Sequence, residues 1–310
     1  MKILVPSDLE LSLDLPDGVD AVEYEPGRPI SSADHDAQMV VSWLDSPGWI
    51  AENLTKLPDL KVVQSCKAGV DLLLESPLSP EIAICSGRGL HDQTVAEHAT
   101  AIVLAMLRRL PLLLERQREH VWNNEGYEAP VLRPDGQLMS LIESNVLIWG
   151  FGSIGKTLAP VLTALGANVR GVARSDGERH GYPVVSDIRA ELPNTDVLMM
   201  ILPASAETTK ALNAELLELL PPHAVIVNVG RGVTVDEEAL VEALNEGKIA
   251  GAALDVTATE PLPAESPLWD APGVLITPHV AGNRPLGAAD LIARNVRNLL
   301  AGTPLENQVR

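Results

Sequence analysis

The sequence predicts an α/β protein in which parallel sheets form two doubly wound domains. Short apolar runs are separated by helical or loop segments along the chain. Within each run, apolar residues follow one another directly instead of alternating with polar residues. Continuous runs are typical of strands covered on both faces, and strands that alternate with helices imply right-handed crossovers in parallel sheets. The length of 310 residues favours a division into about two domains.

The strands of the amino-terminal part are bounded by Pro, Gly, Ser or Asp, which favour turns. We expect them at Ile3–Pro6, Ala21–Tyr24, Met39–Trp43, Val62–Ser65 and Ile82–Cys85. A long helix is then expected from Asp92 or Thr94 to about Glu119, because apolar residues recur there every three or four positions. Pro111 is expected to kink this helix.

A second alternating series follows residues 123–144, which we expect to form a loop. Its strands are expected at Val146–Trp149, Val169–Ala173, Val197–Leu202, Ala224–Val229, Gly251–Val256 and Val274–Thr277. Its helices are expected at Ser153–Leu165, Ala214–Leu220 and Asp236–Asn245, with a final helix from about Leu286 to Leu300. Strands that alternate with helices in this way predict another parallel sheet.

The chain is strongly acidic and has few cysteines. Its 23 Lys and Arg against 42 Asp and Glu give a net charge of −19, which argues against nonspecific binding to nucleic acid or to an anionic membrane. Cys66 and Cys85 form no CxxC pair and no zinc-like cluster, so we expect no metal site and a reducing cytoplasm. No signal peptide is evident, and the longest apolar stretch is too short and too charged to span a bilayer.

The sequence GFGSIG at residues 150–155 follows an expected strand and begins an expected helix. Gly150 permits a tight turn, Gly152 lets the backbone approach a pyrophosphate, and Gly155 lets the helix pack closely on the strand. The N–H groups at the start of the helix favour a phosphate. This context predicts a dinucleotide site rather than a glycine-rich turn without a ligand.

The end of the next strand indicates which dinucleotide binds. A site for NAD carries an acidic residue there for the ribose 2′-hydroxyl. This sequence has Ala173 instead, followed by Arg174 and Ser175. Arg174 can pair with a 2′-phosphate and Ser175 can donate to it. NADP is therefore favoured, and NAD stays possible.

Three polar residues follow the ends of expected strands. Arg231 lies between two glycines, Glu260 comes five residues after Asp255, and His279 follows Pro278. Because ligands bind outside the carboxyl ends of strands in such sheets, we expect the three side chains to converge on one crevice. A histidine can deliver a proton to a ketone reduced by hydride, a carboxylate can orient its ring, and an arginine can bind a carboxylate or the reacting carbonyl.

With these motifs the sequence resembles the D-isomer-specific 2-hydroxyacid dehydrogenases, which include glyoxylate/hydroxypyruvate reductases and phosphoglycerate dehydrogenases. The matching motifs, in chain order, are SCKAGVD (65–71), TVAEHATAIVLAMLRR (94–109), GFGSIG (150–155), LPASAET (202–208), VNVGRGVTVDEEAL (227–240), ALDVTATEPLP (253–263) and TPHVAG (277–282). The resemblance implies two Rossmann-like domains. A dinucleotide-binding domain at 94–284 would be inserted into a flavodoxin-like substrate domain formed by 1–93 and 285–310.

The resemblance also implies roles for individual residues. His279 would be the acid/base, Glu260 would orient it, and Arg231 would bind substrate together with His279. The backbone N–H groups of Ala68, Gly69 and Val70 would hold the substrate carboxylate. The cofactor would be lined by Thr94, Gly150, Gly152, Ser153, Ile154, Gly155, Arg174, Ser175, Leu202, Pro203, Val229, Gly230, Asp255 and Gly282, with Asp255 near the nicotinamide amide. The helix after Thr94 would form much of a homodimer interface.

Lys67 stands where the family usually has a small residue. Its ammonium group could recognise a second anionic group of the substrate, or it could point to solvent. The sequence as a whole predicts an NADP-preferring reductase that converts a small 2-keto acid, such as glyoxylate or hydroxypyruvate, to the D-2-hydroxy acid. Two alternatives stay open: a formate- or phosphite-type dehydrogenase on the same fold, although Glu260 argues against formate, and a dinucleotide-sensing corepressor without activity.

Overall fold

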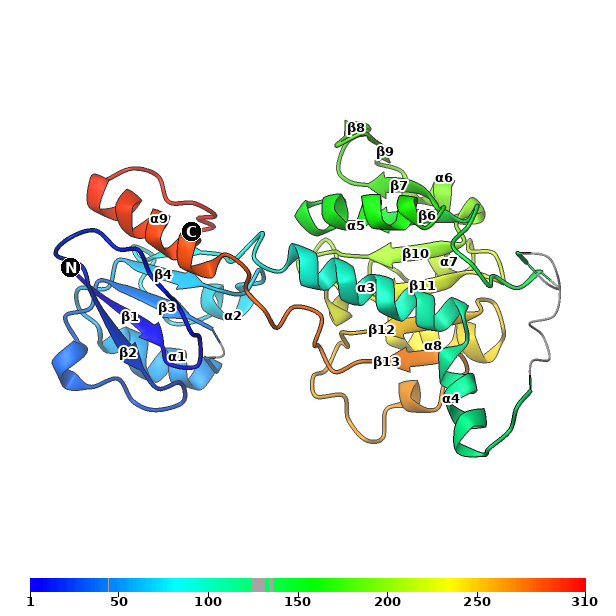
Figure 1. Cartoon of the computed structure of the whole chain (residues 1–310), viewed down its shortest axis with the longest axis horizontal. Coiled ribbons are helices and arrows are strands. Elements are labelled where there is room, and N and C mark those ends of the chain that lie inside the picture. Colours follow the sequence, from blue (N-terminus) through cyan, green and yellow to red (C-terminus); the bar gives the residue numbers. More distant parts are fainter. Residues whose placement is uncertain (44, 124–131, 134–135) are drawn as a thin grey trace. The chain divides into compact units, whose positions relative to one another are not determined.

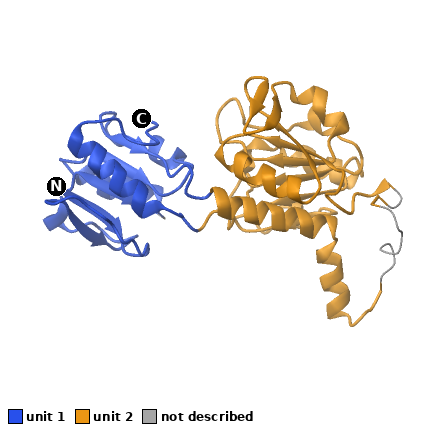
Figure 2. Ribbon diagram, turned by 45° about the horizontal axis from the view of Figure 1, so that its top comes forward, with its two compact units in different colours: residues 1–91, 284–310 blue, residues 92–283 orange. Residues whose placement is uncertain are grey.

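The computed structural model describes residues 1–43, 45–123, 132–133 and 136–310. The chain divides into two compact units, and Figures 1 and 2 show the elements of each. Unit 1 consists of Met1–His91 and Arg284–Arg310, and unit 2 consists of Asp92–Asn283. Most of the loop expected at 123–144 is described, but its residues 124–131 and 134–135 lie outside the described residues.

Unit 1 contains a five-stranded parallel sheet in the order β2-β1-β3-β4-β5. This is the order of flavodoxin-like sheets. Its strands are β1 (Lys2–Pro6), β2 (Asp20–Tyr24), β3 (Met39–Ser42), β4 (Val62–Ser65) and β5 (Ala83–Cys85). Its helices are α1 (Pro47–Asn53), α2 (Asp71–Leu74) and α9 (Ala288–Ala301), with short 3-10 turns η1 (Ser32–Asp34) and η2 (Leu54–Lys56).

Alternate strand residues of unit 1 enter two separate cores. Val40 and Val63 pack with residues of α1 and α2 on one face of the sheet. Met39 and Val62 pack with residues of α9 on the other face. Because both faces are covered, every residue of β3 and β4 is buried, and this explains the continuous apolar runs from which the strands were predicted.

Unit 2 contains an eight-stranded sheet in the order β13-β12-β11-β10-β6-β7-β9-β8. Neighbouring strands are parallel except for β8, which is antiparallel to β9. The central order matches the 3-2-1-4-5-6 order of dinucleotide-binding sheets, with the switch point between β6 and β10. The strands are β6 (Asn145–Trp149), β7 (Asn168–Val172), β8 (Gly177–Arg179), β9 (Tyr182–Val185), β10 (Val197–Met200), β11 (Val225–Asn228), β12 (Gly251–Leu254) and β13 (Val274–Ile276).

Helices cover both faces of this sheet as well. Helices α3 (Asp92–Leu107) and α5 (Ser153–Ala164) lie side by side on one face, where they pack on Ile148 and Val227 (Figure 1). Residues of α7 (Ala214–Leu217) and α8 (Glu237–Asn245) pack on Leu147 and Ile226 on the other face. The remaining elements are α4 (Leu110–Arg118), α6 (Ile188–Glu191), η4 (Leu192–Asn194), η5 (Gly232–Thr234) and η6 (Pro267–Trp269). The predicted fold class, with two doubly wound α/β sheets, is confirmed.

The prediction of a single long helix from residue 92 to about 119 is wrong, because the structure has two helices there. Helix α3 ends at Leu107, and Arg109 adopts the left-handed conformation with φ of 49° before α4 begins. Pro111 lies in the first turn of α4, where a missing N–H leaves no helical hydrogen bond unmade. Pro111 therefore starts a new helix instead of kinking a continuous one.

The hairpin of β8 and β9 was not predicted. Its turn consists of His180 and Gly181, both at positive φ (55° and 83°), between the paired residues Arg179 and Tyr182. Two positive φ values are what a type I′ turn requires, and the usual signal for it is Asn-Gly or Asp-Gly. A His-Gly turn between strands of three and four residues gives a weaker signal in the sequence.

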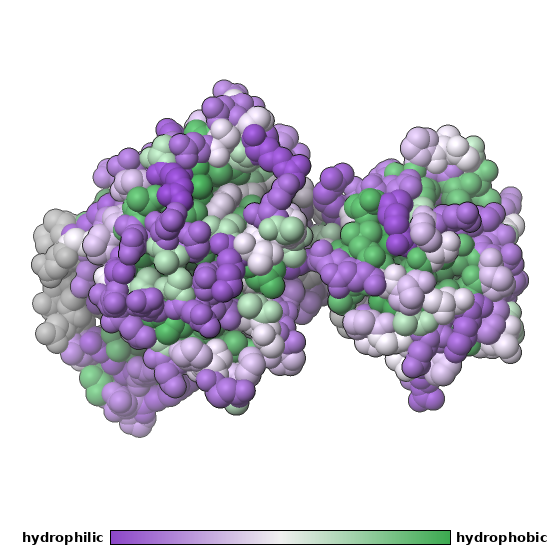
Figure 3. Space-filling view, turned by 180° about the vertical axis from the view of Figure 1, so that it is seen from behind, coloured by the Kyte–Doolittle hydropathy of each residue, from purple (hydrophilic) through white to green (hydrophobic). Residues whose placement is uncertain are grey.

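The face of the molecule drawn in Figure 3 mixes hydrophilic and hydrophobic side chains over both units. No helix in the described part of the chain combines the length and the apolar character that crossing a membrane requires. Among the same residues, no group of three or more His, Cys, Asp or Glu side chains is arranged to hold a metal ion.

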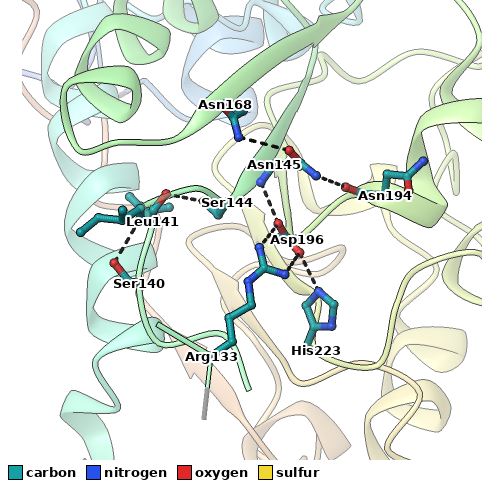
Figure 4. Close-up of polar contacts among 10 residues, drawn as sticks. Arg133, Ser140, Leu141, Ser144, Asn145, Asn168, Asn194, Asp196 and His223 are labelled. Carbon is teal, nitrogen blue, oxygen red and sulfur yellow. Dashed lines mark hydrogen bonds and ion pairs between the residues drawn. The ribbon is translucent and has the colours of Figure 1, made fainter. Parts of the chain in front are cut away.

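A buried aspartate joins three segments at the amino end of β10 (Figure 4). Asp196 accepts hydrogen bonds from both terminal nitrogens of Arg133 (2.9 and 2.6 Å), from the backbone N–H of Asn145 (2.7 Å) and from Nε2 of His223 (2.6 Å). Its side chain is 5% exposed. Burial alone would raise the pKa of this carboxyl, but the hydrogen bonds from Arg133, Asn145 and His223 outweigh burial and lower the pKa.

We expect Asp196→Asn to lower the free energy of unfolding by about 3 kcal/mol at neutral pH, because it leaves Arg133 without its buried partner. Urea unfolding measures this change. Since the pKa of Asp196 is lower in the folded state, its contribution is present above the ordinary aspartate pKa of about 3.9 and is lost as the pH falls through the folded value. The difference between Asn variant and wild type should therefore shrink in acid.

Asp176→Asn is the matched control for this prediction. Asp176 also has a lowered pKa, because Ser186 donates to it from its hydroxyl and backbone N–H, but it lies on the surface. We expect a much smaller loss of stability for this variant. If Asp176→Asn and Asp196→Asn lowered the free energy of unfolding equally, burial of the Asp196 carboxylate would not explain the loss.

Candidate active site

The three glycines after β6 have distinct geometric roles. A Cβ on Gly150, which has φ of 101°, would lie 2.5 Å from the carbonyl oxygen of Ile201, and a Cβ on Gly155 would lie 3.2 Å from the carbonyl oxygen of Gly150. A Cβ on Gly152 would meet no atom within 4 Å, so the space over this residue is open. No side chain caps the start of α5 at Gly152. Open space over an uncapped helix N-terminus fits the phosphates of a dinucleotide.

Two arginines and a serine lie near the end of β7. Arg174 is 94% exposed, with Nη2 3.4 Å from a carboxylate oxygen of Glu207. Ser175 accepts a hydrogen bond of 3.0 Å from Nη2 of Arg179, which is the last residue of β8. Arg179 was not among the predicted cofactor residues, because the hairpin that carries it was not predicted. The two guanidinium groups and the hydroxyl could together hold a phosphate.

His279 and Glu260 form a hydrogen-bonded pair although they are 19 residues apart in the sequence. Nδ1 of His279 lies 2.6 Å from Oε2 of Glu260, and Oε1 of Glu260 accepts from the backbone N–H of Thr257 at 3.1 Å. Partial burial would raise the pKa of Glu260, but His279, the Thr257 N–H and the charge of Arg231 together lower it. Glu260 therefore stays ionised, and it fixes the orientation of the imidazole ring.

Asp255, directly after β12, organises the turn that carries His279. Its carbonyl oxygen accepts from the His279 N–H (2.8 Å), and its carboxylate oxygens accept from the N–H groups of Val280 (3.0 Å) and Ala281 (3.1 Å). The Asp255 side chain is 1% exposed. His279 has φ of 52°, a conformation that residues with a Cβ rarely adopt, and these three hydrogen bonds hold it there.

Arg231 follows β11 in a loop packed tightly between two others. A Cβ on Gly230 would lie 2.7 Å from the backbone nitrogen of Leu202, and one on Gly232 would lie 1.9 Å from the carbonyl carbon of Thr257. The two glycines thus let the Arg231 loop approach the loop that contains Glu260. Nη1 of Arg231 donates to the Gly230 carbonyl at 2.8 Å, and its charge helps to lower the pKa of Glu260. The structure therefore brings Arg231, Glu260 and His279 to one part of unit 2.

The remaining predicted cofactor residues also belong to unit 2. Thr94 lies in the first turn of α3, and Ser153 begins α5, where its hydroxyl donates to Asp92 at 3.1 Å. Ile154 follows in the first turn of α5. Leu202 and Pro203 follow β10, Val229 and Gly230 follow β11, and Gly282 follows the His279 turn.

The predicted substrate residues Lys67, Ala68, Gly69 and Val70 belong to unit 1, between β4 and α2. The Lys67 N–H donates to the Ser65 hydroxyl at 3.0 Å, and the Lys67 carbonyl accepts from the Gly87 N–H at 2.7 Å. A Cβ on Gly87 would lie 2.5 Å from the carbonyl carbon of Cys66, so this glycine permits the close packing of the two loops. The roles assigned to these four residues stay predictions.

Residues 100–281 match the model of the D-isomer specific 2-hydroxyacid dehydrogenase NAD-binding domain. The chain belongs to this family. It is similar to glyoxylate/hydroxypyruvate reductase A of Salmonella heidelberg, with 37% identity over 267 residues that cover 81% of this chain and 80% of the relative.

Solved structures of other family members are similar over nearly the whole chain. A D-isomer specific 2-hydroxyacid dehydrogenase of Xanthobacter autotrophicus, in complex with NADPH and MES, is 30% identical with a TM-score of 0.81, over 99% of this chain and 98% of the other. An NADPH-dependent glyoxylate/hydroxypyruvate reductase of Sinorhizobium meliloti, in complex with NADP and malonate, is 30% identical with a TM-score of 0.76, over 99% of this chain and 96% of the other.

Proposed function

We propose that this family member is an NADP-dependent reductase of small 2-keto acids, of the glyoxylate or hydroxypyruvate type, that forms the D-2-hydroxy acid. The observation that carries the proposal is the 2.6 Å pair of His279 and Glu260 in the same unit as Arg231 and an open glycine turn. The reductase activity of the Salmonella relative and the NADPH complex of the Xanthobacter structure support it. Neither the formate- or phosphite-type alternative nor the corepressor alternative has such support.

The residues of the site have complementary roles in this reaction. When bound, the nicotinamide cofactor supplies the hydride that the carbonyl carbon of the keto acid accepts. His279 donates a proton from Nε2 to the carbonyl oxygen, which becomes the hydroxyl of the product. Glu260 accepts from Nδ1 and stabilises the charged ring before the proton leaves. Arg231 binds the substrate through its planar set of donors.

The substrate loop in this proposal consists of residues 67–70. The backbone N–H groups of Ala68, Gly69 and Val70 hold the substrate carboxylate, and Lys67 recognises a second anionic group where the substrate has one. Asp255, which holds the His279 turn, lies near the nicotinamide amide of the bound cofactor in this proposal. We propose that the protein is cytoplasmic and forms a homodimer, and the exposed leucines 110, 112 and 114 on α4 support the homodimer.

A panel of keto acids tests the proposed function. We expect purified protein to consume NADPH with glyoxylate or hydroxypyruvate, and pyruvate and phenylpyruvate extend the panel. Formate and phosphite with NADP test the alternative dehydrogenase activity in the same assay. Absence of turnover with every keto acid, from mildly acidic to mildly alkaline pH, would reject the proposal.

Arg179→Ala should raise the KM for NADPH about tenfold and leave the KM for NADH nearly unchanged. The guanidinium group of Arg179 bonds Ser175 and would meet the 2′-phosphate, which NADH lacks. Steady-state kinetics with NADPH and with NADH measure the two KM values. Arg170→Ala is the control, because Arg170 is an exposed arginine of β7 that pairs with Glu191. An equal rise for both cofactors in Arg179→Ala would contradict the assignment.

A further inference from the structure

His98, in the middle of α3, contacts the end of the strand that leads to the His279 turn. Its Nε2 lies 3.0 Å from Oγ1 of Thr277 and 3.2 Å from Oδ1 of Asp255. The His98 side chain is 21% exposed. Helix α3 packs on β11 and β12, so His98 approaches this turn from a separate element of unit 2.

The hydrogen-bond directions among these three residues are determined by their chemistry. Thr277 donates its hydroxyl proton to Oδ1 of Asp255 at 2.6 Å, so its oxygen is left to accept from His98. The carboxylate of Asp255 only accepts. Nε2 of His98 therefore carries a proton and donates toward Thr277 and Asp255.

This contact reaches the residues that shape the His279 turn. Asp255 accepts the N–H groups of residues 279, 280 and 281, and His279 is held at φ of 52°. A left-handed residue with a side chain relaxes to another conformation unless its surroundings prevent it. His98 adds a hydrogen bond from a helix to the Thr277–Asp255 pair at the base of the turn.

We propose that His98 is a positioning residue of the reaction: through Thr277 and Asp255 it fixes the turn that directs His279 at the carbonyl oxygen of the substrate. The inference rests on the proposed function, in which His279 is the acid/base. Helix α3 then helps to align His279, the proton donor. This role requires a hydrogen-bond donor at the position of Nε2 of residue 98, whatever the shape of the side chain.

Four variants separate a hydrogen-bond role from simple packing. In His98→Gln an amide nitrogen can still donate near the position of Nε2, whereas His98→Leu has no donor. Thr277→Val removes the hydroxyl at nearly constant size. We expect His98→Leu and Thr277→Val each to lower kcat about tenfold or more, with little change in the KM for NADPH. The double variant should have a kcat no lower than that of the slower single variant.

Rescue and control complete the experiment. His98→Gln should keep most of the wild-type kcat. Thr100→Val should be neutral, because the Thr100 hydroxyl bonds the Ala96 carbonyl within α3 at 2.7 Å. Should His98→Leu not fold, Thr277→Val and His98→Gln still decide the question. A wild-type kcat in Thr277→Val, additive losses in the double variant, or a His98→Gln variant as slow as Thr277→Val would overturn the inference.

A readout without turnover distinguishes this inference from the proposed function. The ring-nitrogen NMR signal of His279 is assigned by its loss in His279→Asn. We expect it to shift or broaden in Thr277→Val and to stay unchanged in Thr100→Val. Lack of keto-acid turnover by the wild type rejects the proposed function alone, whereas an unchanged His279 signal in Thr277→Val rejects the positioning role.

Discussion

His279→Asn should lower kcat by about 10²- to 10⁴-fold, the usual contribution of a positioned proton donor, while the affinity for NADPH changes little. The imidazole is the group that gives a proton to the carbonyl oxygen, and an amide cannot replace it. Asparagine is chosen because it tolerates the left-handed conformation that His279 adopts at φ of 52°. Single-turnover kinetics and NADPH titration measure the two quantities separately.

His120→Asn is the control for this variant. His120 is an exposed histidine that also has positive φ, 57°, after the end of α4. The same substitution in the same backbone conformation should leave kcat unchanged. If His279→Asn kept more than a tenth of the wild-type kcat, His279 would not be the proton donor.

The sheets of this protein could be predicted because their strands are buried on both faces. A run such as the one in β10, buried at every position, has few alternatives to a central parallel strand. Elements that depend on one local conformation could not be predicted in the same way. The break at Arg109 and the His180–Gly181 turn each depend on a positive φ at a residue with a side chain, Arg109 and His180, and such residues seldom adopt it.

The candidate site shows the same division. That Arg231, Glu260 and His279 would come together followed from their places after strand ends, and the structure shows Glu260 bonded to His279 and influenced by the charge of Arg231. The contact of His98 with Thr277 joins residues 179 positions apart, and it depends on which face of α3 meets β12. The apolar periodicity of α3 gives no information about a partner for the ring nitrogen of His98.

Arg231→Lys should lower kcat/KM for the keto acid about 10²-fold and leave the Kd for NADPH nearly unchanged. The guanidinium group donates through Nη1 to the Gly230 carbonyl at 2.8 Å, and the proposed function assigns its planar set of donors to the substrate. A lysine ammonium is a point charge on a flexible chain, so it cannot bond Gly230 and also present parallel donors. Transient and steady-state kinetics with the best keto acid measure the loss.

Arg231→Gln separates geometry from charge at the same position. Lysine keeps the positive charge that helps to lower the pKa of Glu260, whereas glutamine removes it. Glu260 should therefore stay ionised to lower pH in the lysine variant, and the glutamine variant should lose its remaining activity earlier as the pH falls. Arg189→Lys, which changes an exposed arginine paired with Glu215, should have no effect. If the activities of the two Arg231 variants fell at the same acidic pH, the charge of residue 231 would have no effect on the pKa of Glu260. Arg231 would then act on the substrate alone.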